Sequence, residues 1–142
     1  MGKINSRNKG ASFERDIANK INDFLEQNCD RFPKFKDIPK VKRNLDQYQE
    51  KGLGDLELPN HIIECKRYAS GNWYKQDWWE QTVTSRAGNI PVLIWKYNHQ
   101  PIRVCLPLSV LSKNWRYPNR QKTDVTAVIE FETWLWTLCY NL

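Results

Sequence analysis

The 142-residue sequence has no long hydrophobic run. Its longest uninterrupted apolar stretches, such as residues 92–95, fall far short of the roughly 20 residues that cross a bilayer. The basic segment at residues 1–10 has no apolar segment behind it and is therefore unlike a secretory signal. We expect a cytoplasmic protein with no membrane among its partners.

The sequence also lacks the spacing of a zinc site. Its cysteines, Cys29, Cys65, Cys105 and Cys139, stand 34 to 40 residues apart, without a CxxC pair and without a histidine at zinc-finger spacing. We expect reduced and mostly buried thiols.

The composition suits a folded, basic protein. Hydrophobic residues make up 40% of the chain and aromatic residues 13%, which is enough for the core of one compact domain. There are 22 Lys and Arg against 16 Asp and Glu, and the formal net charge of +6 makes a polyanion a natural partner. Internal repeats and low-complexity segments are missing. We expect a single domain over residues 1–142, with a core at about 9–107 and a C-terminal addition at 108–142.

The apolar pattern predicts an α/β arrangement with a mixed sheet. Helical spacing predicts a first helix over residues 12–27, with Ser12 as its N-cap and with Glu14 and Asp16 in its first turn. The prolines and basic residues of 29–40 predict a loop. The further elements expected are strands at 41–46, 55–58, 61–67, 91–97, 102–107 and 125–129, helices at 77–87 and after 129, a loop at 47–54, and a flexible connection or lid at 68–76.

The predicted hairpin brings two acids together. If it turns at Pro59-Asn60 with an even-length loop, residues whose numbers sum to 119 face each other, so Asp55 faces Glu64. Opposed side chains have Cβ atoms roughly 4.5 to 5.5 Å apart, and like charges there are destabilising unless a cation lies between them. Because side chains alternate along a strand, Lys66 shares the face of Glu64.

Two carboxylates beside an ammonium suit metal-dependent phosphodiester hydrolysis. Mg²⁺ takes oxygen ligands, usually one or two carboxylates, and leaves positions for water and a phosphate oxygen. Lys66 can orient or deprotonate the attacking water, or offset charge that builds in the transition state. The plainer alternative is a pair of solvated acids on an exposed hairpin. Glu57, on the face of Asp55, is either an outer ligand or solvated.

Asp55 followed by Glu64-x-Lys66 resembles the motif of the PD-(D/E)xK nuclease superfamily, with Gly54 where the pattern often has Pro. Within the superfamily, the chain is most similar to the archaeal-type Holliday junction resolvases and their phage relatives, over roughly residues 9–97. The further residues that carry this resemblance are Lys9-Gly10 and Glu14-Arg15 at the first helix, Val41-Lys42-Arg43 as a basic strand, and Gln81 in the helix after the motif.

The resemblance implies a fold, an activity and a site. The fold would be an α/β restriction-endonuclease-like core, with a central mixed β-sheet flanked by helices. The activity would be Mg²⁺-dependent, structure-selective DNA cleavage by a homodimer that nicks a four-way junction symmetrically, with Mn²⁺ able to replace Mg²⁺. The implied catalytic residues are Glu14, Asp55, Glu64, Lys66 and Gln81, and the implied metal ligands are Asp55, Glu64 and the backbone carbonyl of Cys65.

Basic residues outside the motif are candidates for DNA contact. In the dense basic run at 31–43, phosphate contact competes with an ordinary solvated loop. A second basic segment, 113–122, carries Trp115 and Tyr117 and is either a nucleic-acid surface or a mobile loop. The DNA-binding residues we expect are Lys9, Arg15, Lys34, Lys36, Lys40, Lys42, Arg43, Arg67, Lys75 and Arg116.

Two rival functions stay open at this point. One is a nuclease of the same superfamily with another target, such as a duplex-nicking, flap or restriction-like enzyme. The other is a DNA-binding module without turnover, in which the acids are structural and only the basic surfaces matter.

Overall fold

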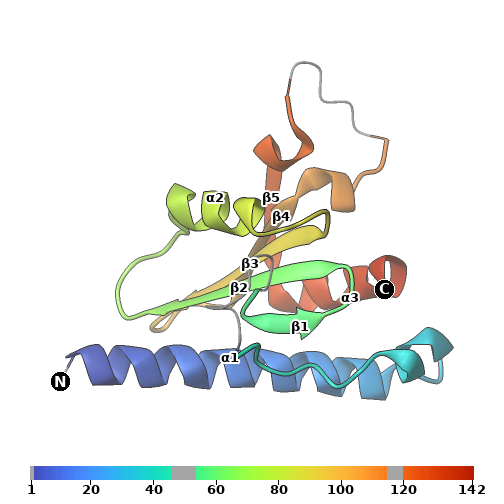
Figure 1. Cartoon of the computed structure of the whole chain (residues 1–142), viewed down its shortest axis with the longest axis horizontal. Coiled ribbons are helices and arrows are strands. Elements are labelled where there is room, and N and C mark those ends of the chain that lie inside the picture. Colours follow the sequence, from blue (N-terminus) through green and yellow to red (C-terminus); the bar gives the residue numbers. More distant parts are fainter. Residues whose placement is uncertain (1, 46–53, 115–119) are drawn as a thin grey trace.

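The computed structural model describes residues 2–45, 54–114 and 120–142, and the side chains of the first helix from residue 9 onward. Most of the loop expected at 47–54 lies outside these residues, as do Trp115, Arg116 and Tyr117 of the second basic segment. Figure 1 shows a twisted sheet with helices on both of its faces.

The first helix, α1, spans Gly2–Gln27 and is longer than predicted. The expected start at residue 12 is wrong, so Ser12 is not the N-cap, and Glu14 and Asp16 lie in mid-helix rather than in the first turn. Gly10 lies within the added part without ending it, because a single glycine costs a helix only about 1 kcal/mol. The predicted apolar stripe is buried, and its members are Phe13, Ile17, Ile21, Phe24 and Leu25.

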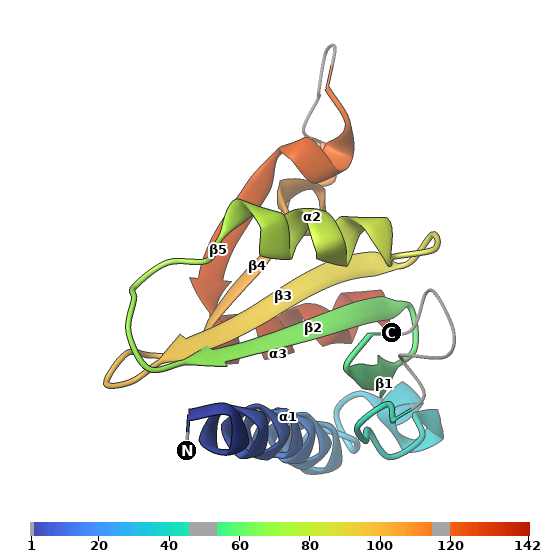
Figure 2. The ribbon, with the colours of Figure 1, turned by 60° about the vertical axis from the view of Figure 1, so that its left-hand side comes forward.

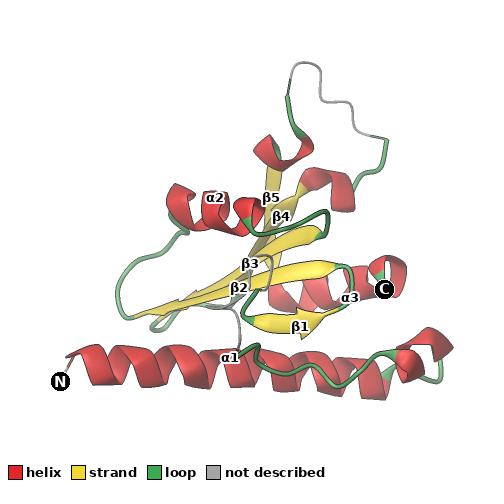
Figure 3. Cartoon of the chain, viewed as in Figure 1, coloured by secondary structure: helices red, strands yellow, loops and turns green. Residues whose placement is uncertain are grey.

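Five strands form one mixed sheet in the order β1-β2-β3-β4-β5 (Figure 3). They are β1 (Leu56–Leu58), β2 (His61–Tyr68), β3 (Ile90–Tyr97), β4 (Arg103–Pro107) and β5 (Thr126–Glu130). β2 and β3 run parallel, whereas the other neighbours are antiparallel. A parallel pair needs a crossover, and the helix α2 (Gln76–Thr84) lies in that connection. The structure therefore confirms the expected α/β fold with a central mixed sheet.

The helices divide the sheet into two faces (Figure 2). α1 and the C-terminal helix α3 (Phe131–Asn141) pack against one face, where the main core contains Trp134. α2 covers the other face, above a smaller core that contains Trp95 and Tyr97. The segment expected as a C-terminal addition supplies both β5, which pairs with β4, and α3. It thus completes the sheet and closes the main core.

The strand expected at 41–46 is wrong for the described part of that segment. Residues 41–45 make one isolated bridge, between Arg43 and Leu56, instead of a strand. Two backbone hydrogen bonds support it, from the N–H of Asn44 to the carbonyl of Asp55 and from the N–H of Glu57 to the carbonyl of Lys42. β1 has only three residues, so it offers too little edge for a longer ladder.

The adjacent Trp78 and Trp79 cannot point the same way on α2, which predicts that one of them is exposed or at a subunit contact. Both are buried instead. Trp78 stacks on Tyr68, with ring centroids 5.1 Å apart, while the Trp79 indole N–H donates to the carbonyl of Thr123. Both tryptophans are buried because two different segments contact α2: Tyr68, which precedes the helix, contacts Trp78, and Thr123, which follows it, contacts Trp79.

Three short 3-10 helices complete the described structure: Pro33–Asp37 within the predicted basic loop, Leu108–Val110 and Lys122–Asp124. None of the helices in the described part of the chain has both the length and the apolar character that crossing a bilayer requires. The described cysteines are free thiols, and two of them, Cys105 and Cys139, are buried.

Trp134 and Trp136 allow a matched test of the core. Trp134 is 1% exposed, whereas Trp136 is 49% exposed and touches the edge of one ring, Phe24. We expect Trp134→Ala to lower the free energy of unfolding by about 3–5 kcal/mol, because it leaves a large cavity. Trp136→Ala should cost no more than about 1.5 kcal/mol, the scale of one aromatic pair. Urea denaturation monitored by circular dichroism measures both, and equal losses would contradict this account of the core.

Candidate active site

The candidate active site begins where β1 meets β2. Leu56 faces Ile63 and Leu58 faces His61, which is the predicted register. Asp55 stands just before β1. Its side chain replaces a backbone acceptor there, because its Oδ2 accepts a hydrogen bond of 2.7 Å from the N–H of Cys65. The backbone N–H of Asp55 donates to the carbonyl of Ile63, also at 2.7 Å. The carboxylate of Asp55 is therefore fixed against the middle of β2.

Gly54 allows this close approach. A Cβ at position 54 would lie 2.6 Å from the carbonyl oxygen and 2.7 Å from the nitrogen of Ile63, and both are backbone atoms that cannot move aside cheaply. Proline also carries a Cβ, so the same contact argues against the residue that the nuclease pattern often has here. The departure from the pattern has a steric reason in this chain.

Glu64 shares a buried position with Asp55. The two residues are 6% and 7% exposed, and their carboxyl groups are hydrogen-bonded to each other. Burial, the charge of Asp55 and a hydrogen bond with its side chain together raise the pKa of Glu64 to about 9, against the opposing effect of Lys66. Without a cation, Glu64 is thus protonated at neutral pH because two buried carboxylates cannot both ionise cheaply.

α1 brings a third acid, Glu14, toward this pair. Its Oε2 accepts a hydrogen bond of 2.7 Å from Nε of Arg43, and both side chains are largely covered, with 14% and 29% exposed. Burial raises the pKa of Glu14, the hydrogen bond from Arg43 lowers it in part, and the charge of Asp55 raises it further. The ion pair links α1 to the segment that precedes β1.

Lys66 lies on the same side of β2 as Glu64, as predicted from alternation. In the parallel register, Glu64 pairs with Leu93 and Lys66 with Trp95, and both partners belong to the core under α2. The side chain of Cys65 points the other way and packs against the main core. Its backbone N–H donates to Asp55, and because the N–H and C=O of a strand residue point to the same edge, its carbonyl lies on this side of β2 as well. The structure brings together four of the five predicted catalytic residues: Glu14, Asp55, Glu64 and Lys66.

Comparison with known proteins identifies the family. A family model described as "Phage putative PDDEXK endonuclease" matches residues 5–135. The chain belongs to this family. No curated protein and no solved structure matched the chain. The match covers all four clustered residues, and it agrees with the superfamily and the phage connection expected from the motif.

The oxygen donors of this candidate site suit a hard divalent cation. Among the described residues, no three His, Cys, Asp or Glu side chains are grouped to hold a metal ion. Mg²⁺ does not need such a group, because it usually takes one or two carboxylates and fills the remaining positions with water and phosphate oxygens. Asp55 and Glu64 could supply the carboxylates and Cys65 a carbonyl. Glu64 keeps its proton because its buried surroundings lack a sufficient positive charge, so a bound cation would favour its ionised, ligating form.

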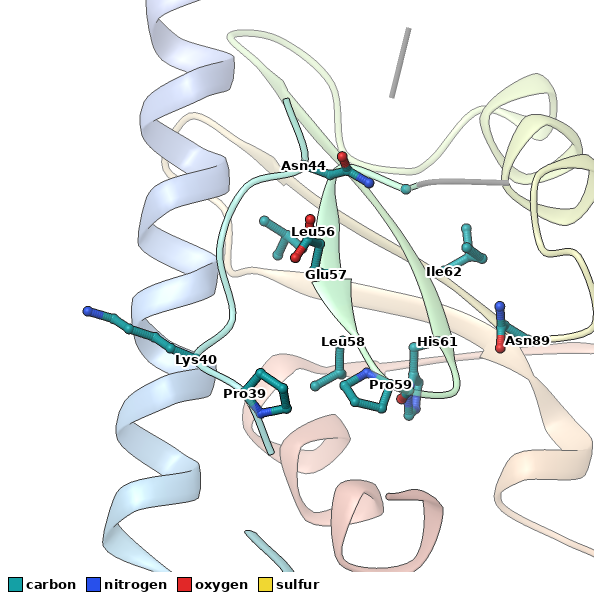
Figure 4. Close-up of a pocket in the computed structure, with 11 residues that line it drawn as sticks. Pro39, Lys40, Asn44, Leu56, Glu57, Leu58, Pro59, His61, Ile62 and Asn89 are labelled. Atoms are coloured by element: carbon teal, nitrogen blue, oxygen red, sulfur yellow. The ribbon is translucent and has the colours of Figure 1, made fainter. Parts of the chain in front are cut away.

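Gln81, the fifth predicted catalytic residue, lies on α2, outside the hairpin and the first helix that carry the other four. It is exposed on α2, and within the described part of the chain its side chain makes no hydrogen bond; only its carbonyl is used, by Ser85. Glu57 is exposed on β1 and lines a cavity of about 330 Å³ beside the hairpin (Figure 4). That cavity is also lined by Lys40, Asn44 and His61, whereas the carboxylates of Asp55 and Glu64 do not line it.

The predicted DNA-binding residues divide by how their charges are used. Arg43 is occupied by Glu14, a pairing that the sequence analysis missed because 29 positions separate the two residues. Exposed positions are held by Arg15, Lys36, Lys40, Lys42 and Lys75. Contacts within the protein are made by Lys9 with Asn98, Lys34 with the carbonyl of Cys139, Lys36 with Asp30, Arg67 with the carbonyl of Tyr68, and Lys75 with the ring of Trp78. Arg116 lies outside the described residues.

The pKa of Glu64 predicts a pH dependence of stability in EDTA. Between the ordinary pKa of 4.5 and the folded value of about 9, the folded protein keeps a proton that the unfolded chain has lost. The free energy of unfolding should therefore fall as pH rises through this window. Glu64→Gln removes the titration and should flatten that slope, whereas Glu80→Gln, at an exposed position on α2, should leave it unchanged.

The measurement is urea unfolding in EDTA from pH 5 to pH 9 for the wild type and both variants. A Glu64→Gln protein with the full wild-type slope would show that Glu64 is ionised in the folded state.

Proposed function

We propose that this PDDEXK protein is a DNA endonuclease that depends on a divalent metal, with Asp55, Glu64 and the carbonyl of Cys65 as the ligands. The observation that carries the proposal is the pair of buried acids, Asp55 and Glu64, beside Lys66. Mg²⁺ is the expected ion, and Mn²⁺ should replace it because both accept oxygen donors. The net charge of +6 supports DNA as the substrate.

Each clustered side chain has a part in the proposed reaction. When bound, a divalent cation stabilises charge on a phosphate oxygen and lowers the pKa of a bound water. Lys66, on the face of Glu64, is placed to orient the attacking water and to offset negative charge on the phosphate. Asp55, held by the N–H of Cys65, keeps one oxygen turned to β2 and offers the other to the site. Glu14, held by Arg43, supports the pair from α1.

The substrate that we propose is a branched DNA, in the first instance a four-way junction cut symmetrically by a homodimer. The resemblance of Lys9-Gly10, Glu14-Arg15 and the basic segment 41–43 to junction resolvases supports this choice. The dependence of DNA binding on salt should be steep, because exposed lysines of the basic run displace counterions from the phosphates.

Asp55→Asn and Lys66→Ala test the site. Either change should reduce metal-dependent cleavage by at least about 100-fold, the lower end of what a positioned acid, base or charge contributes. Binding of DNA in Ca²⁺ or EDTA should stay largely intact. Glu57→Gln is the matched control, because Glu57 is an exposed acid two residues from Asp55. Unchanged cleavage by either site variant would remove the assignment, and the absence of any metal-dependent product from the wild type would favour a non-catalytic DNA-binding module.

Substrate choice is tested on a panel of related sequence: a four-way junction, a flap, a linear duplex and a single strand, each with Mg²⁺. We expect paired, symmetrical cuts confined to the junction, as a two-fold dimer would make. Gel analysis of both labelled strands shows the symmetry. Equal cutting of linear duplex would defeat the junction assignment and favour a duplex-nicking or restriction-like enzyme.

A further inference from the structure

Two large aromatic side chains beside the candidate active site are exposed to solvent. Tyr68 is 46% exposed and Trp73 is 51% exposed. Tyr68 ends β2 and Trp73 belongs to the connection between β2 and α2. Rings of this size normally serve the core, and the core under α2 already holds Trp78, Trp79 and Trp95. Two further rings at one end of that core are exposed and so are accessible to a ligand.

The two rings lie close to Lys66. Tyr68 follows Lys66 by two residues on the same face of β2, about 7 Å along the strand. Trp73 meets the ring of Trp95 edge-on, with centroids 5.8 Å apart, and Trp95 is the direct partner of Lys66 on β3, about 4.8 Å away across the sheet. Both rings therefore lie on the side of the sheet that carries Glu64 and Lys66.

Both rings are held in place by contacts behind them. Tyr68 stacks nearly parallel on Trp78, with 5.1 Å between ring centroids and an angle of 10°. The Tyr97 hydroxyl donates to the carbonyl of Trp73 at 2.7 Å. Gly71 has a φ of +142° and lies so close to the ring of Tyr97 that a side chain at position 71 would clash with it. The connection is thus packed in one conformation, which reduces the entropy that binding would cost.

The charges around the rings suit a nucleic-acid strand. Lys75 holds its ammonium 5.7 Å from the ring centre of Trp78, and Arg67 donates to the carbonyl of Tyr68 at 2.6 Å. Asp77 lies in the first turn of α2, and the acids of the candidate site, Asp55 and Glu64, lie further back along β2 beside Lys66. A basic aromatic surface of this kind binds single strands, because every base has a face that can stack and the phosphates need counter-charge.

We propose that Tyr68 and Trp73 form a stacking platform for unpaired bases of the DNA strand that is cut. The inference rests on the proposed nuclease function and specifies its substrate: DNA in which nucleotides next to the cleaved bond are unpaired or unstacked. A continuous duplex covers the faces of its bases by stacking them on each other, so it cannot use the platform. A branch point, gap or flap exposes those faces.

The experiment measures binding in EDTA, where cleavage cannot interfere, by fluorescence anisotropy of labelled DNA. The probes are a single-stranded 20-mer, its full duplex, and the same duplex with a three-nucleotide gap. We expect Trp73→Leu and Tyr68→Leu to weaken binding of the single strand and the gapped duplex by about 5- to 100-fold, with less than a twofold change for the full duplex. Trp73→Phe and Tyr68→Phe keep a ring and should retain most of the binding.

Leucine is chosen because it preserves apolar contact with Trp95 or Trp78 while removing the aromatic face. Trp136→Leu is the matched control, because Trp136 is 49% exposed on α3, across the sheet from the platform. It should leave all three affinities unchanged. If a leucine variant fails to fold, a histidine variant at that position (Trp73→His or Tyr68→His) takes its place. Its smaller ring should bind the single strand less tightly than the phenylalanine variant does, and equal binding would overturn the platform.

Unchanged binding of the single strand by Trp73→Leu would overturn the platform, and so would an equal loss for all three probes, which would indicate a phosphate or general packing effect. The proposed function fails by a different result. If Asp55→Asn cleaves like the wild type while Trp73→Leu selectively loses the single strand, the platform stands and the catalytic assignment falls.

Discussion

The arrangement of the site depends on one repulsion, between two carboxyl groups that share a buried place on one strand edge. Asp55 and Glu64 are both more than 90% covered, and they tolerate each other because Glu64 keeps a proton. Two features of the backbone position the pair: the N–H of Cys65 fixes Asp55, and Gly54 lets the backbone approach Ile63 closely. The protein thus stores an unfavourable electrostatic position that a cation would relieve.

The sequence predicted the parts of the fold that local patterns control. The hairpin register followed from Pro59-Asn60 and alternation alone, and the buried stripe of α1 from helical spacing. The clustering of Glu64 with Lys66 followed from the same alternation. The start of α1 was missed for two reasons. No proline separates residues 2–11 from the apolar stripe, and a serine such as Ser12 is a typical N-cap residue even where, as here, it lies inside a helix.

The parts that failed depend on contacts between distant segments. The pairing of Arg43 with Glu14 joins residues that lie far apart in sequence, and no local signal distinguishes it from a phosphate contact. Trp78 and Trp79 are both buried because different segments cover the two sides of α2, which periodicity cannot reveal. Gln81 matched a motif by its position in the chain; it is exposed on α2, and its implied catalytic part stays a prediction.

The parallel pairing of β2 with β3 constrains the order in which the chain can fold. A parallel neighbour cannot form by a tight turn, so the chain must complete α2 and return before β2 has its second partner. Until then the hairpin carries its acids in open water, where Glu64 ionises normally and nothing orients Lys66. A half-made chain therefore lacks the partner strand beside Glu64 and Lys66, and the proposed site would form only with the finished sheet.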